Sequence, residues 1–573
     1  MREGATPETE SAATALQALS ARYWEFLRHE FPLGALTAGA ANDDPTMFRE
    51  APADFARRAQ EARSMLGRLS GVALGELPPQ DRITHRLLER ELHDLCEVHA
   101  TGSSLRPWLL PVGPEFNTVY FAQLSAVGDV RAAQAYVARL ATVPTYFTDV
   151  QACLQEGDER GVRHPKVVLR AAVANMRATA AGTATETPWF GPFKRSPAAS
   201  PAGVAAQAQR ASEIIEDRIV PALHALADFL EHELLPRGRD TLACTEGPQG
   251  EAFYAFWVRH FTTVETLTPQ AVHLLGLEQV QRLEGEIAEV AAQAGFVGDV
   301  AAYRRRLRED HSFLAPSGAA LLEQVQALAK RIDGKIPSVM GRLPRATYGV
   351  QSIPEALAEK LPLAYAQPNP ADGSSAGMFW VSSLPERVPS YLHLSLALHE
   401  AWPGHLMHIA LMQEMRTLPM FRRANFTKYS ACLEGWAMYC EGLGQEMGLY
   451  ETPHQHFGRL DMEMWRACRL VVDTGIHLHG WSREQAIDFM AQRLTLPRPA
   501  IEAEVDRYIA MPAQALGYMV GGLKFRELRE RAQQRLGERF DLRAYHDQLM
   551  EAGAVTLPVL DEVVDSWLAG QPA

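Results

Sequence analysis

Four side chains that can bind a metal or move a proton lie close together in the segment LALHEAWPGHLMH. They are His399, Glu400, His405 and His408. In the common His-Glu-x-x-His arrangement, two histidines four residues apart share one helical face and bind zinc, while the glutamate activates a water molecule. Here His399 and His405 are six residues apart, so a regular helix would point them about 120° away from each other. A regular helix therefore cannot form this site.

The residues between these histidines indicate how the chain could overcome their separation. Pro403 lacks the N–H group that would bond the carbonyl of His399, and its ring crowds that carbonyl, so the helix must bulge or break. Such a distortion can bring His405 back toward His399. The pair His405 and His408 needs no distortion, but it removes Glu400 from its usual place beside a ligand. We favour His399 and His405 and keep His408 as the alternative.

A third protein ligand is expected, because a catalytic zinc usually has three and keeps one position for water. Glu434, in the segment ACLEGWAMYCEG, is the best candidate. Apolar residues surround it on an expected helix, and a carboxylate buried there needs a partner. Glu441 follows seven residues later, close to the same helical face. It is the alternative ligand, or a group that orients one.

Two later segments carry groups suited to the transition state of amide hydrolysis. Asp473 and His477 are four residues apart on one face of an expected helix, and Gln514 and Tyr518 have the same spacing. The tetrahedral intermediate needs a hydrogen-bond donor for its oxyanion, and His477 or Tyr518 could supply it. Gln514 is expected to help bind the substrate.

Cations and a strand complete the set of expected substrate contacts. Lys524 or Arg469 has the chemistry to bind the terminal carboxylate of a peptide. The segment Gly377–Ser383, with Trp380 near its centre, is rich in strand-favouring residues and lies shortly before the metal motif. We expect it to form a sheet edge that binds the substrate backbone by strand addition.

A competing signal for a serine hydrolase is weak. Gly373 to Gly377 matches Gly-x-Ser-x-Gly, with Ser375 in the nucleophile position. That motif requires a strand before it and a helix after it. Here a proline-rich loop precedes it and a strand-like run follows, so a serine nucleophile is not expected.

The elements that must position these groups are mostly helices. Apolar residues recur at helical spacing from Leu16 until Pro32 ends the pattern. Further helices are predicted over 78–100, 130–155, 205–235, 270–295, 318–332, 391–415, 430–448, 459–479, 483–493 and 523–550. Proline- and glycine-rich stretches interrupt them at 181–203 and 236–250. We therefore expect an N-terminal helical lobe over 1–240 and a catalytic lobe over 241–573, with a small β element beside the active-site helix.

Composition excludes several classes of protein. Of the 573 residues, 47% are hydrophobic and 22% are charged, as in ordinary globular proteins. The net charge of −13 and the lack of a basic block argue against a nucleic-acid partner. No apolar run is long enough to span a membrane, and the polar N-terminus lacks the features of a secretion signal, so a cytoplasmic location is expected. Six scattered cysteines without a Cys-x-x-Cys pair favour free thiols.

Several further segments, in order along the chain, resemble one family. They include ARYWEFLRHEFPL, GEAFYAFWVRHFTTVETLTPQAVHLLGL, HEAWPGH, LEGWAMYCE, RLVVDTGIHLHGWSREQAIDFM and PAQALGYMVGGLKFRELRERA. Together they make the chain similar to the bacterial domain of unknown function 885, whose members are described as helical, zincin-like metallopeptidases. The resemblance implies that His399, His405 and Glu434 bind Zn²⁺ and that Glu400 is the general base. It also implies that His477 and Tyr518 are site residues and not ordinary core residues.

These observations predict a zinc-dependent hydrolase that cleaves amide bonds of short peptides with metal-activated water. One alternative is a hydrolase of small-molecule amides that uses the same zinc site in specialised metabolism. Another is a catalytically silent binding protein, although such a protein would have little need for Glu400 beside metal-binding histidines. The sequence leaves the exact substrate, exo- or endo-action, the physiological metal and the oligomeric state open.

Overall fold

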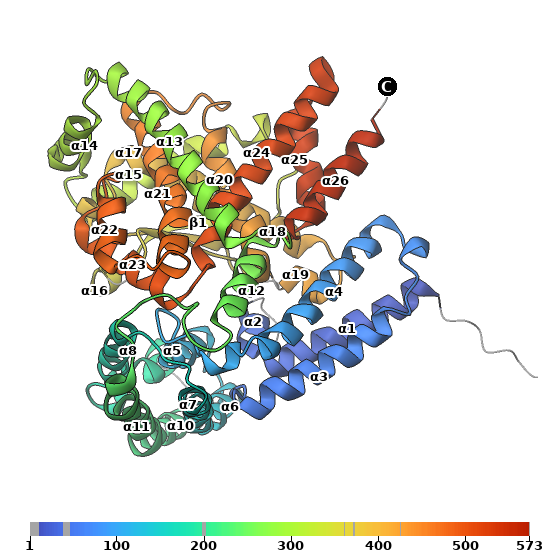
Figure 1. Cartoon of the computed structure of the whole chain (residues 1–573), viewed down its shortest axis with the longest axis vertical. Helices are drawn as coiled ribbons and strands as arrows, with labels where there is room; N and C mark the ends of the chain where they lie inside the picture. The colour runs from blue at the N-terminus through green and yellow to red at the C-terminus, as the bar shows by residue number, and fades with distance from the viewer. Residues whose placement is uncertain are drawn as a thin grey trace, which may run out of the picture.

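The computed structural model describes residues 11–37, 46–196, 202–359, 361–370, 373–424 and 426–571. The fold is mainly α, as the sequence predicts, with one small sheet. Helices of the N-terminal part fill the lower half of the view in Figure 1, and most later helices fill the upper half. Buried apolar residues of both parts form one continuous core. The division into lobes at residue 240 stays a prediction.

The opening helix shows how local sequence sets the elements. Ser11 caps α1 (Ala12–Glu30) by accepting a hydrogen bond from the backbone of Thr14, and Leu16, Leu19 and Tyr23 lie buried on one face. The following helices of this part are α2 (Pro32–Thr37), α3 (Pro52–Leu69), α4 (Pro79–Ala100), α5 (Pro114–Leu124), α6 (Val130–Leu140), α7 (Val143–Glu159), α8 (Lys166–Thr179), α9 (Gly191–Arg195), α10 (Ala202–Ile214) and α11 (Val220–Phe229). The range 130–155, predicted as one helix, is divided between α6 and α7.

The later part contains the helices that carry the candidate site. They are α12 (Gly250–Thr262), α13 (Pro269–Gln293), α14 (Val300–Glu309), α15 (Gly318–Asp333), α16 (Glu355–Ala358), α17 (Ser390–Glu400), α18 (His405–Glu414), α19 (Met420–Ala424), α20 (Ser430–Leu443), α21 (Pro453–His477), α22 (Arg483–Ala491), α23 (Arg498–Ala510), α24 (Gly517–Leu536), α25 (Leu542–Ala552) and α26 (Leu557–Ala569). The predicted helices over 391–415 and 523–550 are each broken in two.

Glycines bring α20 and α24 into direct contact, and these two helices carry Glu434 and Tyr518. A Cβ atom on Gly521 would lie 1.8 Å from the carbonyl oxygen of Ala431, and one on Gly435 would lie 2.4 Å from the carbonyl carbon of Gly521. Real Cβ contacts are never that short, so larger side chains would push the helices apart. The close approach places residues of α24 beside the glutamate of α20.

The sheet has the order β1-β3-β2, formed by β1 (Tyr348–Ser352), β2 (Ala364–Gln367) and β3 (Gly377–Val381). The predicted strand is β3, but it is the central strand: it pairs in parallel with β1 and antiparallel with β2. Its backbone groups are therefore already bonded on both sides. The expectation that this strand is a free edge for the substrate is wrong, because strand pairing between distant segments cannot be seen in local sequence.

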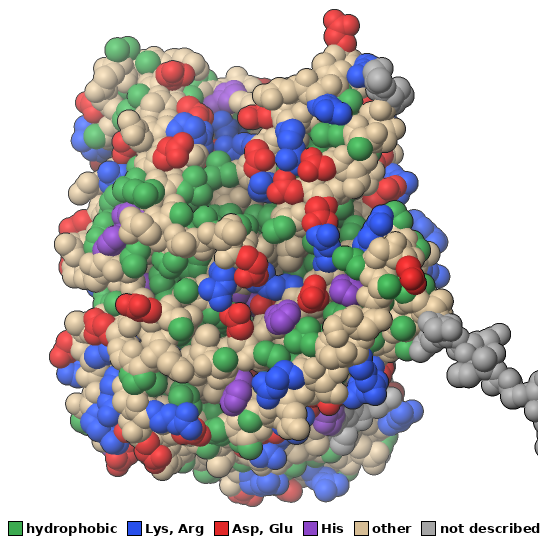
Figure 2. Space-filling view, turned by 45° about the vertical axis from the view of Figure 1, so that its right-hand side comes forward, with side chains coloured by type: hydrophobic (Ala, Val, Ile, Leu, Met, Phe, Trp, Pro, Cys, Tyr) green, Lys and Arg blue, Asp and Glu red, His purple; other side chains and the backbone are tan. Residues whose placement is uncertain are grey.

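Two further features bear on the sequence predictions. Ser375 lies in an exposed bend directly before β3, without a strand before it or a helix after it, so it lacks the setting of a nucleophile elbow. Among the described helices, none combines the length and apolar character that crossing a membrane requires. On the face shown in Figure 2, acidic and basic side chains are interspersed.

Candidate metal centre

The segment HEAWPGH is a break between two helices, and this break brings two histidines together. α17 ends at Glu400, α18 begins at His405, and the four residues between them form a tight connection. The rings of His399 and His405 lie 4.7 Å apart between centroids and nearly perpendicular, at 87°. The indole N–H of Trp436 on α20 donates to the carbonyl of Pro403 at 2.9 Å and so holds the connection against that helix.

Gly404 makes this connection possible, because its backbone passes over the end of α17. A Cβ atom there would lie 2.0 Å from the carbonyl oxygen of His399. We therefore expect Gly404→Ala to lower the free energy of unfolding by about 1–3 kcal/mol, as overpacking does, and to weaken metal binding because it displaces both histidines. Chemical denaturation and metal analysis would measure the two effects.

Gly285→Ala is the matched control for this substitution. Gly285 lies within α13, and a Cβ atom there would meet nothing within 4 Å. Replacement of a helical glycine by alanine at such a position should leave stability unchanged or raise it by about 0.5–1 kcal/mol. If Gly404→Ala were as well tolerated, the close packing of the connection would not be required for the site.

Glu434 of α20 completes a cluster with the two histidines. Its Oε2 atom lies 3.4 Å from Nε2 of His399 and 3.3 Å from Nε2 of His405. One potential ligand atom from each of the three residues lies within 4.8 Å of the others. Both histidines are buried, with 5% and 7% of their surface exposed. Burial alone would raise the pKa of Glu434, but the charges of His405 and His399 hold it far below its usual value.

His408 and Glu441, the two alternatives that the sequence leaves open, lie outside this cluster. The buried ring of His408 faces Trp436 at 6.2 Å between centroids, and burial lowers its pKa to about 4. Glu441 contacts the other side of His399, with its Oε1 atom 2.9 Å from Nδ1. The geometry thus groups His399, His405 and Glu434 as potential ligands, and Glu441 contacts the ring nitrogen of His399 that faces away from the cluster.

Glu441 and Arg466 fix the orientation of His399. Arg466 on α21 donates to Oε1 of Glu441 at 3.0 Å, and both side chains are buried. Burial alone would lower the pKa of His399, but the neighbouring carboxylates of Glu434 and Glu441 raise it to about 9. A carboxylate on the far nitrogen of a histidine is the usual arrangement behind a metal ligand, because it directs the other nitrogen to the metal.

The donor set is compatible with zinc. At 3.3 and 3.4 Å, the contacts of Glu434 Oε2 with the imidazoles are too long for strong hydrogen bonds, and this atom has no other partner in the described part of the chain. A cation shared by the three groups would satisfy this buried oxygen. Two imidazoles and one carboxylate are a known set of protein ligands for catalytic zinc.

Glu400 is placed differently from the ligand residues. It is the last residue of α17, directly after His399, and its side chain is partly exposed. Among the described residues it has no hydrogen-bond or ion-pair partner, while its charge helps raise the pKa of His399. Its carboxylate is thus beside the cluster and available to a water molecule or a substrate.

Tyr518 lies next to the cluster from the opposite helix. Burial and the charge of Glu434 raise its pKa, and its phenol bonds with Gln514. Arg507 donates to the Oε1 atom of Gln514, which leaves the amide N–H₂ group of Gln514 to face Tyr518. Because the phenol oxygen accepts that bond, its own O–H proton is directed elsewhere.

Comparison with known sequences and structures identifies the family of the chain. The model of the family described as "Bacterial protein of unknown function (DUF885)" matches residues 32–564. The chain belongs to this family. The matched range includes every residue of the candidate centre.

Two solved structures share the fold of this DUF885 protein. A protein from Colwellia psychrerythraea, described as a "putative lipoprotein", has 26% sequence identity and a TM-score of 0.91, with 98% of this chain and 100% of that chain covered. A "putative lipoprotein of unknown function" from Shewanella oneidensis has 18% identity and a TM-score of 0.72, with 97% and 100% covered. No curated protein matches the chain.

These related structures correct the expected cellular location. Both are described as lipoproteins, a class of membrane-anchored proteins. The prediction of a cytoplasmic location is therefore wrong. It depended on the polar character of the N-terminus, and residues 1–10 lie outside the described part of the DUF885 chain.

Two residues predicted to act on the substrate have other partners. His477 is fully buried, with its Nδ1 atom accepting from the backbone of Cys244 at 3.1 Å and its Nε2 atom 2.9 Å from the carbonyl of Tyr508. Lys524 is paired with Glu527 at 2.5 Å and with Asp561 at 3.1 Å. These contacts occupy both side chains, and their parts in catalysis and substrate binding stay predictions. Helical spacing alone could not reveal these distant partners.

Arg469 and Trp380 are also engaged by neighbours. The guanidinium of Arg469 lies 4.5 Å from the ring centre of Tyr518, but it bonds with the hydroxyl of Tyr508 at 3.1 Å and with Glu504 at 3.2 Å. Arg469 therefore supports the ring of Tyr518. Its Nη1 atom has no hydrogen-bond partner among the described residues, and its part in binding a substrate carboxylate stays a prediction. Trp380 donates to the side chain of Gln367 on β2 at 2.8 Å, and its part in substrate binding stays a prediction.

Sequence reasoning missed the support of Tyr518 from α23. Glu504 bonds with Arg507 at 2.8 Å and with Tyr508 at 2.7 Å, and these residues hold Gln514 and Arg469 in turn. The segment EVDRY carries the acid three residues before the arginine and four before the tyrosine, which places all three on one helical face. That spacing was the available signal.

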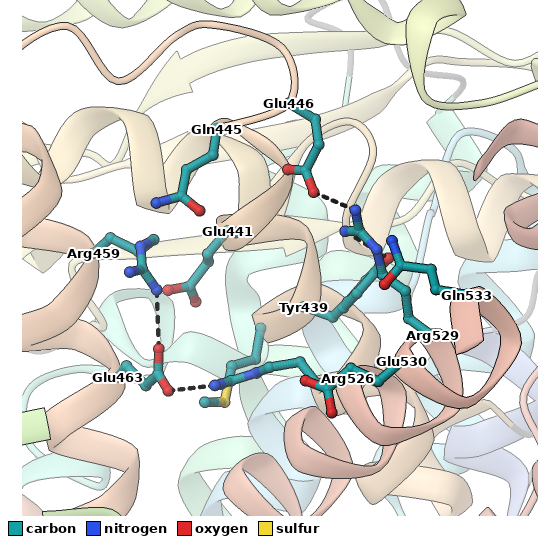
Figure 3. Close-up of a pocket in the computed structure, with 12 residues that line it drawn as sticks. Tyr439, Glu441, Gln445, Glu446, Arg459, Glu463, Arg526, Arg529, Glu530 and Gln533 are labelled. Atoms are coloured by element: carbon teal, nitrogen blue, oxygen red, sulfur yellow. Dashed lines mark hydrogen bonds and ion pairs between the residues drawn. The ribbon is translucent and has the colours of Figure 1, made fainter. Parts of the chain in front are cut away.

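A charged cavity of about 260 Å³ lies behind Glu441, between α20, α21 and α24. Figure 3 shows that each arginine lining it has a carboxylate partner: Arg459 and Arg526 both point to Glu463, and Arg529 points to Glu446. Burial alone would raise the pKa of Glu463, but the surrounding arginines lower it to about 2. The cavity is therefore lined by a network of ion pairs on the far side of His399.

Proposed function

We propose that this DUF885 protein is a zinc-dependent hydrolase that cleaves amide bonds of short peptides. The observation that carries the proposal is the convergence of His399, His405 and Glu434, with the unpaired carboxylate of Glu400 directly beside them. Two imidazoles and a carboxylate leave a coordination position for water, as catalytic zinc sites require. A purely structural zinc site would be closed by a fourth protein ligand.

The roles of the residues follow from their positions. When bound, zinc would polarise the scissile carbonyl and lower the pKa of its water toward ~7. Glu400 accepts the proton of the attacking water and returns it to the leaving amine, because it is a carboxylate without another partner in the described chain. Glu441 and Arg466 keep His399 in the orientation that directs Nε2 toward the cluster.

Tyr518 is the proposed donor to the oxyanion. Its oxygen accepts from Gln514, whose amide orientation is set by Arg507, so the phenol proton remains free to bond with the substrate. Its raised pKa keeps the phenol protonated at neutral pH, as a donor must be. We therefore expect Tyr518→Phe to lower kcat by roughly tenfold to a thousandfold, with a smaller change in KM.

Steady-state kinetics on a cleaved peptide would measure this effect. Tyr120→Phe is a suitable control, because its ring stacks on Phe116 of the same helix, α5, outside the candidate centre. Full activity of Tyr518→Phe would remove this residue from the mechanism, whereas a rise in KM alone would make it a binding residue only.

The burial of the centre predicts short substrates. Of the described residues at the centre, Glu400, Glu434, Gln514 and Tyr518 are partly exposed, while both histidines are buried. An extended peptide can reach such a site, but a peptide bond within a folded protein cannot. We expect cleavage of peptides of about two to ten residues and no rapid cleavage of a folded protein such as lysozyme.

A peptide library analysed by mass spectrometry tests this function. Cleavage of short peptides that stops on chelation supports it. If small-molecule amides were hydrolysed and peptides were untouched, the substrate assignment would be replaced by an amidohydrolase of the same centre. If zinc bound and no amide were cleaved, the protein would be a binding protein.

A further inference from the structure

A second cavity lies where the N-terminal helices meet the loop that leads to Gln514. It measures about 40 Å³, and its walls come from three separated parts of the chain: 106–109, 163–168 and 239–253. Residues Ile509, Ala510 and Pro512 close its remaining side. A water molecule needs about 10–15 Å³ in such a measure, so the cavity has room for a small polar group and not for a whole peptide.

Basic side chains dominate this cavity. Arg106, Arg163, Arg239 and His164 line it, and of the described residues in its wall only Glu246 is acidic. Arg163 is paired with Asp158 at 2.6 Å, and the exposed side chain of Glu246 bonds with Thr241. Arg106 and Arg239 have no carboxylate partner among the described residues, whereas each arginine that lines the cavity beside Glu441 has one.

Backbone carbonyls hold these two arginines in place. Arg106 donates to Pro248 and Gly102, while Arg239 donates through Nε to the carbonyl of Arg163 at 2.8 Å and through Nη1 to Ala243. A parallel backbone bridge between Pro165 and Arg239 fixes Arg239 beside the wall segment 163–168. Both guanidinium groups are thus positioned without being neutralised.

Donors remain unused at this position. The Nε atom of Arg106 and the Nη2 atom of Arg239 have no hydrogen-bond partner in the described chain, yet neither is sealed from solvent. The Nε2 atom of His164 is buried and also has no partner. Burial lowers the pKa of Arg106 and of Arg239, and the charge of Arg239 lowers that of Arg106 further. Two guanidinium groups that line one cavity without carboxylate partners repel each other, and an anion between them would offset that repulsion.

We propose that this cavity binds an anionic group, a carboxylate or a phosphate, between Arg106 and Arg239. Guanidinium groups bind the oxygens of both anions through pairs of N–H donors. The anion can be the terminal carboxylate of a peptide or a free inorganic anion, since both present the same oxygens. The site is independent of the proposed hydrolysis, because binding requires neither the metal centre nor turnover.

Isothermal titration of the full-length protein with inorganic phosphate tests the site. Arg106→Gln should weaken phosphate binding by roughly tenfold to a hundredfold, the loss of a charged hydrogen-bond donor. Arg423→Gln is the matched control, because Arg423 also donates to a backbone carbonyl, that of Gln413, but lies on α19 away from the cavity. It should leave phosphate affinity within twofold of that of the wild type.

Two further experiments distinguish the two sources of the anion and do not depend on the folding of an arginine variant. The Glu400→Gln protein is titrated with phosphate in the presence of a tripeptide that has either a free or an amidated C-terminus. If only the tripeptide with the free carboxylate competes with phosphate, the natural anion is a peptide terminus. Competition by neither peptide identifies a free anion. A crystal of the wild-type protein soaked in selenate should show anomalous density between Arg106 and Arg239. No phosphate binding, or equal binding by the wild type and Arg106→Gln, would overturn the proposal.

Discussion

Replacing Glu400 with glutamine is expected to leave zinc bound and to lower kcat by roughly a hundredfold to ten-thousandfold, the range that a general base contributes. Glutamine keeps the size of the side chain but cannot accept a proton. Because Glu400 lies beside the cluster and is not one of the three grouped ligands, the metal should stay. Metal analysis and single-turnover kinetics on the same preparation would measure both quantities.

Glu451→Gln is the control for this change. Glu451 is an exposed carboxylate, paired with Arg331 at 2.6 Å, and its replacement should change neither zinc content nor kcat. If Glu400→Gln lost zinc together with activity, Glu400 would be a ligand. If it kept both, the proton would be taken by another group.

The second large effect is a contrast between two neighbouring histidines. His405→Ala should abolish stoichiometric zinc binding, because His405 supplies one of the three converging ligand atoms. The loss should exceed the tenfold to hundredfold that removal of an outer partner such as Glu441 costs. His408→Ala should retain zinc, since the ring of His408 faces Trp436 and not the cluster.

Zinc affinity measured by competition with a chelator of known strength would quantify this contrast. The two variants are well matched, because both remove a buried imidazole from the same helix. Thermal unfolding of the metal-free forms would show whether either substitution disturbs the fold. Retention of zinc by His405→Ala and its loss in His408→Ala would reverse the ligand assignment.

The sequence predicts the parts of the centre that depend on local chemistry. Pro403 and Gly404 predict the distortion of the helix, and the apolar residues around Glu434 predict its burial. The structure turns the distortion into a complete break between α17 and α18. The resemblance to DUF885 proteins is also confirmed, whereas the metallopeptidase activity remains a proposal.

Local sequence could not show the contacts that form where distant segments meet. His477 has the spacing of a site residue, but the backbone of Cys244, more than 200 residues earlier, occupies one of its ring nitrogens. Lys524 is paired with Asp561 of another helix. The central position of β3 depends on β1 and β2, which no local pattern reveals. Helical periodicity identifies a face, but not what packs against it.

The most direct test of the account is a zinc titration of the metal-free protein with peptide cleavage as the readout. The centre formed by His399, His405 and Glu434 predicts that activity is absent without metal and rises linearly until about one zinc per chain is bound. Activity that is already maximal in the metal-free protein, or that zinc at one equivalent fails to restore, would contradict the proposed zinc-dependent mechanism.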